Sequence, residues 1–247
     1  MRIYDSFKNH TKEWFTKSFH WMTEHKLTHV TQVLSLLILD LKNAAKISVH
    51  CLKGMKKEYH PYHLNPKTIS PEQAQLPPTL LIHGYMHNQG VWVTMAKHLE
   101  QREDLGPLFT ITLPSTGGRK AQRRALETKM REIRALYKEA GNKNPNIQLV
   151  AYSDGGYAAL SFLKKSASSL KERVSKLVLV GCHLGNYDGL GLKLQRKTVA
   201  INAKHEFLDP APSMVPFNKT TEINTTHLGL VHSAETAEAI YKNIRAN

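Results

Sequence analysis

A serine stands between two small residues at the point where a buried-looking apolar run gives way to a helix-like stretch. The run 147–151 reads Ile-Gln-Leu-Val-Ala, and Ser153 lies two positions from both Ala151 and Gly155. A strand-to-helix turn that exposes a serine hydroxyl crowds the backbone, so it needs small residues at these two positions. The pattern predicts a nucleophilic serine in an elbow, and an ordinary turn with a helix-capping serine is the alternative.

An acidic residue and a histidine follow this serine along the chain. The run 198–202 is followed by Glu206 and Asp209, and His227 precedes a helix-like stretch at 234–244. A serine becomes a nucleophile when a histidine takes its proton and an acid holds that histidine in the right tautomer. The order serine, acid, histidine is consistent with such a triad, and at this point either acidic residue can supply the carboxylate.

A glycine after the first apolar run indicates the other part of an acyl-transfer site. His83, Gly84 and Tyr85 directly follow the run 79–82. A tetrahedral oxyanion needs two backbone N–H groups, one from such a loop and one from the residue after the nucleophile. We expect Tyr85 and Asp154 to donate them, although the Asp154 carboxylate opposes negative charge there unless a cation pairs with it.

The elements that must position these residues alternate between short apolar runs and helix-like stretches. Near-continuous apolar runs are typical of strands buried on both faces of a parallel sheet. Their alternation with helices predicts a doubly wound, mostly parallel α/β sheet, in which ligands bind at the carboxyl ends of the strands. The expected strands lie at 79–82, 108–113, 147–151, 176–180 and 198–202, and the expected helices at 91–103, 120–141, 157–166 and 234–244.

Two of these segments resemble the lipase and esterase type of the α/β-hydrolase superfamily, and most of all its small lidless bacterial lipases. The stretch 149–156, Leu-Val-Ala-Tyr-Ser-Asp-Gly-Gly, is similar to that family's elbow, in which Ala replaces the more usual first Gly. The stretch 227–233 is similar to its catalytic-histidine segment. The resemblance covers about residues 78–247 and implies the α/β-hydrolase fold, but it does not reach the N-terminal third.

The resemblance also implies a role for each candidate residue. Ser153 is the nucleophile, His227 is the general base and acid, and the amides of Tyr85 and Asp154 form the oxyanion hole. The implied reaction is a two-step acyl transfer through an acyl-enzyme. Such a reaction requires neither a metal nor an organic cofactor, so we expect none.

The acid departs from the family's usual pattern. Placing the stretch 201–206 on the family's acid segment puts Glu206 in the triad, where the family usually has Asp. Glutamate can orient an imidazole too, but its extra methylene moves the carboxylate. Asp209 lies close behind and stays as the alternative acid.

The residue pattern divides the chain into two parts. Residues 1–76 are mostly helical in pattern and become rich in proline towards their end, so we expect a helical N-terminal extension there. The catalytic motifs all lie in 77–247, the expected catalytic domain. Caps in this superfamily are commonly inserted after the strand at 176–180, but only 15 residues, 183–197, precede the next strand. We therefore expect no cap domain.

Composition excludes several classes of protein. A chain of 247 residues with 41% apolar residues can fill a core, so intrinsic disorder is disfavoured. Its two cysteines, Cys51 and Cys182, provide neither a disulfide framework nor a four-thiolate metal site. His25 and His29 lie one helical turn apart, but no Glu follows the first as in zinc proteases, so we expect a solvent-facing pair and no metal.

The positive charge and one amphipathic stretch indicate which kinds of partner the protein could bind. The stretch 30–47 has apolar residues at helical spacing with lysines after it; packing on the protein's own core is the favoured interpretation, and a peripheral membrane or partner-binding helix is the alternative. The net charge is +14, and 115–145 holds nine Lys/Arg against three Glu. A solvated helix face is the default for this segment, and contact with an anionic membrane or substrate is the alternative. Nucleic acid is disfavoured, because no groove-reading motif or interleaved aromatic residues accompany the charge.

The N-terminal sequence and the longest apolar stretch bear on where the protein is expected to act. The N-terminus does not have the pattern of a secretory signal, and the longest uncharged apolar stretch, 27–39, has 13 residues where a membrane span needs about 20. We expect a cytoplasmic protein with possible membrane association that acts in lipid metabolism as a lipase or carboxylesterase. A thioesterase or acyltransferase with the same triad, or a catalytically silent hydrolase-fold module that binds a membrane or partner, is the alternative.

Overall fold

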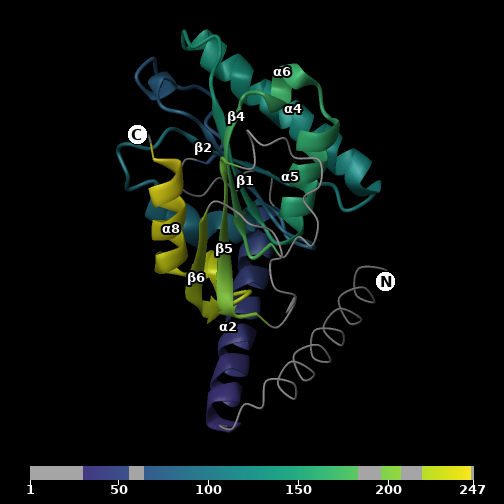
Figure 1. The fold of residues 1–247 in the computed structure, drawn as a ribbon, viewed down its shortest axis with the longest axis vertical. Coiled ribbons are helices and arrows are strands. Elements are labelled where there is room, and N and C mark those ends of the chain that lie inside the picture. The colour runs from purple at the N-terminus through teal and green to yellow at the C-terminus, as the bar shows by residue number, and fades with distance from the viewer. Residues whose placement is uncertain (1–29, 56–63, 183–195, 207–218, 246–247) are drawn as a thin grey trace.

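One parallel sheet organises the chain. In this computed structural model, which describes residues 30–55, 64–182, 196–206 and 219–245, six strands lie in the order β2-β1-β3-β4-β5-β6, and all neighbouring pairs are parallel (Figure 1). The strands are β1 (Thr79–Ile82), β2 (Leu108–Ile111), β3 (Ile147–Tyr152), β4 (Val174–Val180), β5 (Thr198–His205) and β6 (Lys219–Thr226). The expected doubly wound α/β sheet is confirmed, and among the described strands it is parallel throughout.

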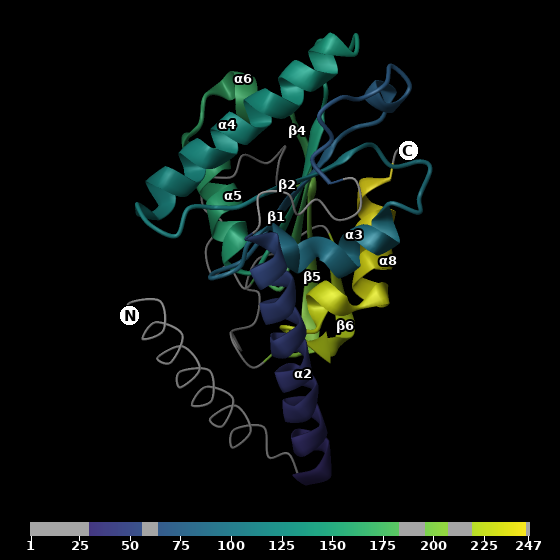
Figure 2. The same cartoon turned by 180° about the vertical axis from the view of Figure 1, so that it is seen from behind.

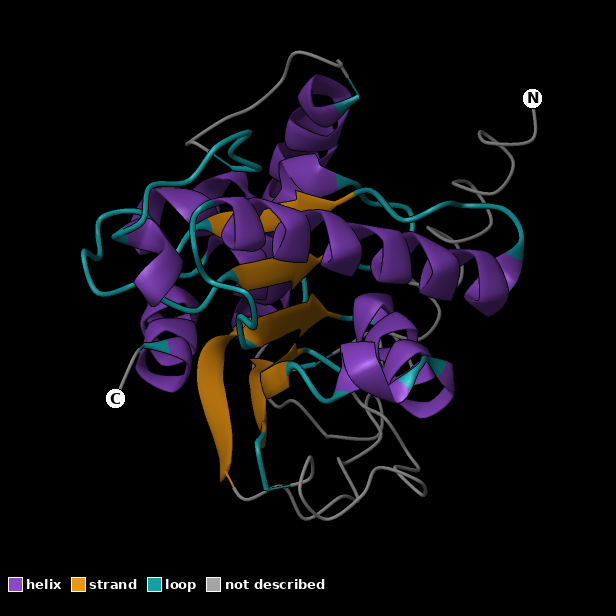
Figure 3. Cartoon of the chain, turned by 90° about the horizontal axis from the view of Figure 1, so that it is seen from above, coloured by secondary structure: helices purple, strands orange, loops and turns teal. Residues whose placement is uncertain are grey.

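Helices cover both faces of the sheet. Figure 2 shows α4 (Gly118–Glu139), α5 (Asp154–Lys165) and α6 (Ser168–Lys171) on one side of the strands, with α3 (Val93–Leu99) and α8 (Ala234–Ile244) on the other. The view from above shows the same two helical layers (Figure 3). The remaining described helices are α2 (Val30–Gly54) and the short η1 (Gln73–Gln75), η2 (Gln89–Trp92) and η3 (Leu230–His232).

Each face of the sheet has its own apolar core, which explains the apolar runs in β1 to β5. In β3, Leu149 and Ala151 pack towards α4 and α5, whereas Val150 and Tyr152 pack towards α3 and α8. Alternate residues of a strand point to opposite faces, so a strand covered on both sides needs apolar residues at every position.

The last strand, β6, contains no continuous apolar run, so the sequence did not predict it. The segment Lys219–Thr226 reads Lys-Thr-Thr-Glu-Ile-Asn-Thr-Thr, and β6 pairs only with β5 among the described strands. Ile223 is buried, whereas Glu222 and Asn224 on either side of it are exposed. An edge strand with one face towards solvent shows this alternation instead of a continuous apolar run.

The helix α2 packs on the domain, but not through the face that its sequence indicates. Its buried side carries Asp40, Asn43, Ile47 and Gly54, whereas Leu41 is exposed. The favoured expectation that the apolar residues of 30–47 pack on the protein's own core therefore holds at Ile47, which belongs to the core, and is wrong for Leu34 and Leu41, which are exposed. The reason lies in tertiary contacts: α2 packs on η2, and the two backbones approach so closely that a side chain at Gly54 or Gly90 would not fit.

These contacts hold the C-terminal end of α2 against η2. The Asn88 side-chain amide donates a hydrogen bond to the Cys51 carbonyl at 2.8 Å. A Cβ atom on Gly90 would lie 2.1 Å from the His50 carbonyl oxygen. Glycine allows this close approach of two backbones. Among the described helices, none combines the length with the apolar character that crossing a membrane requires.

Candidate active site

Ser153 occupies a strained turn between β3 and α5. Its φ of 52° and ψ of −127° lie in a region that residues with a side chain rarely adopt. A Cβ atom on Gly155 would lie 2.5 Å from the His83 carbonyl oxygen, and Ala151 is completely buried. The close approach of the two backbones therefore requires glycine at position 155, whereas the methyl group of Ala151 is accommodated in the core.

A hydrogen-bonded chain joins the serine to a histidine and a glutamate. His227 Nε2 lies 3.0 Å from Ser153 Oγ, and His227 Nδ1 lies 2.8 Å from Glu206 Oε2. Glu206 directly follows β5, His227 directly follows β6, and both side chains are buried. A carboxylate at Nδ1 keeps the proton on that nitrogen and leaves Nε2 free to accept the serine proton. Asp209, the alternative acid, lies outside the described residues.

The loop after β1 lies against the elbow and is tied in place by a neutral histidine. A Cβ atom on Gly84 would lie 3.0 Å from Ser153 Cβ. His83 Nδ1 donates to the Gly84 carbonyl at 2.7 Å, and the Leu113 amide donates to His83 Nε2 at 2.8 Å. Burial lowers the pKa of His83 to about 4, so the imidazole is neutral and both bonds persist at neutral pH. Tyr85 continues this loop beside the serine, and its side chain is exposed.

Asp154 begins α5, where helical N–H groups have no partner within the helix. Its carboxylate accepts two hydrogen bonds from the Arg119 guanidinium, one of them from Nη1 at 2.9 Å and the other from Nη2. Arg119 is also 5.4 Å from the centre of the Tyr157 ring. The carboxylate beside the elbow therefore has the cation that the sequence argument required.

Two aromatic side chains that sequence reasoning did not single out lie beside the histidine: Tyr152 contacts His227, and His87 contacts Tyr152. The Tyr152 hydroxyl donates to the His227 carbonyl at 3.2 Å, and the two rings lie 5.2 Å apart. His87 stacks on the other side of Tyr152 at 5.8 Å, and burial lowers the pKa of His87 to about 3. The place of Tyr152 just before the serine was a usable signal, whereas His87 reaches this position only through the fold.

A second buried carboxylate comes from α2. Asp40 is 1% exposed. Burial raises its pKa from 3.8 to about 6, and the nearby Glu206 carboxylate acts in the same direction, whereas Thr226 and His227 oppose it. No signal in the sequence placed this residue near the candidate site, because its neighbours lie more than 150 positions further along the chain.

The two cysteines lie in different surroundings: Cys51 is half-buried in α2, and Cys182 is buried beneath the elbow. Both are free thiols. Cys182 Sγ donates to the Ser153 carbonyl at 3.1 Å, and burial raises the pKa of Cys182 to about 12. A thiol with such a pKa stays protonated and acts as packing beneath the elbow. Across the described ranges, His, Cys, Asp and Glu side chains form no group of three or more that could hold a metal ion.

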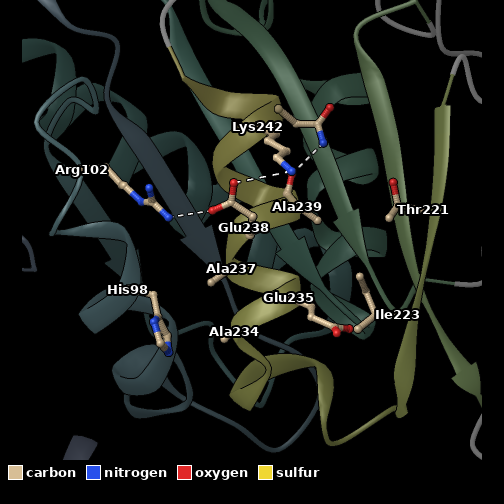
Figure 4. Close-up of a pocket in the computed structure, with 11 residues that line it drawn as sticks. His98, Arg102, Thr221, Ile223, Ala234, Glu235, Ala237, Glu238, Ala239 and Lys242 are labelled. Carbon is tan, nitrogen blue, oxygen red and sulfur yellow. Dashed lines mark hydrogen bonds and ion pairs between the residues drawn. The ribbon is translucent and has the colours of Figure 1, made fainter.

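A surface cavity of about 600 Å³ lies elsewhere, between α3, β6 and α8 (Figure 4). Glu238 bridges two cations at its rim, accepting from Arg102 at 2.7 Å and lying 3.6 Å from Lys242 Nζ. None of Ser153, Glu206 and His227 lines it. The hydrogen-bonded chain, and not cavity size, therefore identifies the candidate site.

Comparisons with known proteins agree with the architecture. No family model matches the sequence, and no curated protein matches it. Among solved structures, the mature lipase BlEst2 of Bacillus licheniformis is 16% identical over 76% of this chain and 96% of its own, with a TM-score of 0.52. Tomato methylketone synthase I, solved with 2-tridecanone, is 11% identical over 69% of this chain and 99% of its own, with a TM-score of 0.52.

At such identities the likeness concerns the fold. The parallel strand order, the turn at Ser153 and these two structures agree with the resemblance found in the sequence. The chain has the fold of the α/β-hydrolase superfamily, without a cap domain in the part that the structure describes.

Proposed function

We propose that this protein is a serine hydrolase that cleaves carboxylic esters, as a lipase or carboxylesterase. One observation carries the proposal: His227 lies within hydrogen-bond distance of both Ser153 Oγ, at 3.0 Å, and Glu206 Oε2, at 2.8 Å. Nucleophile, base and orienting acid need this geometry. The strained turn at Ser153 supports it, because strain of this kind collects at functional sites.

The chemistry proceeds in two steps. Ser153 Oγ attacks the ester carbonyl while His227 Nε2 takes its proton, and the Glu206 carboxylate stabilises the imidazolium that forms. The amides of Tyr85 and Asp154 stabilise the oxyanion, and His227 returns the proton to the departing alcohol. Water then attacks the acyl-enzyme by the same route, which releases the acid and restores Ser153.

The substrate in this proposal is a lipid or small ester. The likeness to a Bacillus licheniformis lipase supports a lipid ester. A thioesterase or acyltransferase uses the same three residues and differs in the leaving group or the acceptor. For partners, we propose that a cytoplasmic protein makes peripheral contact with an anionic membrane through one of its basic segments.

A fluorophosphonate probe tests the proposal directly, because it reacts with an activated serine. We expect labelling of wild-type protein and none of Ser153→Ala, together with a loss of at least about 10³-fold in turnover of p-nitrophenyl butyrate and little change in melting temperature. Ser161→Ala, which alters a serine within α5, is the matched control and should behave as wild type. A folded wild-type protein that is not labelled would instead support the silent binding module.

A further inference from the structure

Most of the exposed large apolar side chains of the described residues belong to one helix. Of ten such residues, six lie on α2 and a seventh directly follows it. The other three are Tyr85, Met86 and Tyr157, which lie in the loop after β1 and in the helix after Ser153. Exposed apolar surface is therefore concentrated on α2 and around the candidate site, and contiguous apolar surface of this kind marks a binding face.

Five of the six exposed apolar residues of α2 share one side of the helix. Leu34, Ile38, Leu41, Val49 and Leu52 are all exposed, and Leu52 is 67% exposed. Most intervals between them are three or four residues and the longest is eight, which places them along one face. We call this set the apolar stripe. It lies opposite the side of α2 that packs on η2, and its five side chains are exposed in the part of the chain that the structure describes.

A row of lysines borders the apolar stripe. Lys42, Lys46 and Lys53 are exposed, and they are spaced by four and seven residues. The one acidic residue within Val30–Gly54 is Asp40, and it is buried. The exposed surface of α2 is therefore apolar and cationic, with no negative charge. This combination is typical of helices that lie in the interface of an anionic bilayer.

The position of α2 relates this face to the candidate site. Its N-terminal half projects past the carboxyl ends of β5 and β6 (Figures 1 and 2). Glu206 and His227 follow those two strands, so the helix and the site share one end of the molecule. Asp40, in the middle of α2, is buried near both residues.

We propose that the apolar stripe and lysine row of α2 bind the surface of an anionic lipid bilayer and hold the Ser153 site at that surface. The leucine and isoleucine side chains enter the headgroup and acyl boundary, and the lysines pair with lipid phosphates. The part that concerns delivery of substrate rests on the proposed ester hydrolysis, whereas the binding itself does not.

Flotation with vesicles tests the proposal on the full chain carrying Ser153→Ala, so that no lipid is consumed. We expect binding to vesicles of equal phosphatidylglycerol and phosphatidylcholine, and at least about tenfold weaker binding to phosphatidylcholine alone or in about 0.5 M NaCl. Leu34→Ser, Ile38→Ser and Leu41→Ser together should weaken binding at least about tenfold without a change in melting temperature.

A matched charge reversal separates α2 from the basic segment of α4. Lys42→Glu, Lys46→Glu and Lys53→Glu should abolish binding. The control reverses three exposed cations of α4, Lys120, Arg124 and Arg131, and should bind within about twofold of the parent.

Two results of the binding assay would overturn the proposal: no binding to anionic vesicles, or loss of binding only in the α4 variant. Two properties of the variant with Leu34→Ser, Ile38→Ser and Leu41→Ser would also overturn it: a lower melting temperature, or dissociation from a dimer to a monomer. The last two would mean that the chain itself or a second copy covers the stripe. Labelling of the Ser153-containing protein by fluorophosphonate is measured separately, so the proposed chemistry can fail while membrane binding holds, and the reverse.

Discussion

At the scale of single residues, Asp154 places a carboxylate beside the amide that we assign to the oxyanion hole. Negative charge at this position opposes an oxyanion. The Arg119 guanidinium holds both carboxylate oxygens, which brings a compensating positive charge to the same place. Two opposite charges in contact act on a nearby oxyanion nearly as a neutral group, so the pair keeps an acidic residue compatible with acyl transfer.

Removal of this cation should therefore impair turnover. We expect Arg119→Gln to lower kcat/KM for p-nitrophenyl butyrate by about three- to tenfold, a modest effect because the arginine is partly exposed. In the Asp154→Asn background the same change should have little effect, and a double-mutant cycle measures the difference. An equal loss in both backgrounds would contradict the proposed neutralisation.

The choice between Glu206 and Asp209 also belongs to this scale. We expect Glu206→Gln to lower kcat by about 10²–10⁴-fold, because an amide no longer holds the Nδ1–H tautomer or stabilises the imidazolium of His227. Asp209→Asn is the matched control and should keep more than about half of the wild-type kcat. If Asp209→Asn instead lost most of the kcat for ester hydrolysis and Glu206→Gln kept it, the triad acid would be Asp209.

At the scale of elements, the junction of β3 and α5 depends on how closely two backbones approach. The α5 backbone passes the end of β1 at Gly155, and the left-handed turn at Ser153 directs the hydroxyl towards His227. Ala151 stands in a strand, where its methyl group is accommodated. The two small positions of the elbow are therefore not equivalent.

Substitutions at these two positions should behave differently. Gly155→Ala should lower stability by more than about 2 kcal/mol and abolish fluorophosphonate labelling, because its methyl group displaces the loop after β1. Ala151→Gly should lower stability by only about 0.5–1 kcal/mol, since it adds backbone freedom in a strand, and should keep labelling. Thermal unfolding and labelling together distinguish the two, and a tolerated Gly155→Ala would refute the steric argument.

At the scale of the whole molecule, α2 brings a carboxyl group from the N-terminal part of the chain into the buried end of the sheet. The pKa of Asp40 is raised by burial to about 6 in the folded protein. A raised pKa means that folding disfavours the ionised form. The resulting loss of stability is absent below about pH 4, grows between pH 4 and 6, and is complete above pH 6.

Asp40→Asn should consequently stabilise the protein at neutral pH. We expect the free energy of unfolding to rise by about 2–3 kcal/mol at pH 7.5 and to change little at pH 4, from a pKa difference of about two units. Urea unfolding at the two pH values measures this, with Glu139→Gln, which alters an exposed carboxylate, as the control. Equal effects at both pH values would show that ionisation of Asp40 is not the cause.

The sequence predicts the strands that are buried on both faces, but it is less informative for elements that have one face exposed to solvent. The five apolar runs all coincide with strands, and the helix at 234–244 has the same bounds in the structure. The polar edge strand β6 was missed, because a strand with one exposed face carries no continuous apolar run. The apolar residues of the stretch 30–47 were expected to pack on the core, because periodicity identifies an apolar face but not what covers it.

The sequence by itself determined the order of the strands along the chain, the small residues around Ser153 and the order serine, acid, histidine. These are local patterns, and strand burial and turn sterics impose them directly on residue type. The tertiary structure alone decided that Glu206 lies 2.8 Å from His227, that Arg119 pairs with Asp154, and that the apolar stripe of α2 faces outward. Such contacts join residues far apart in the chain, and their distances depend on packing that no local pattern records.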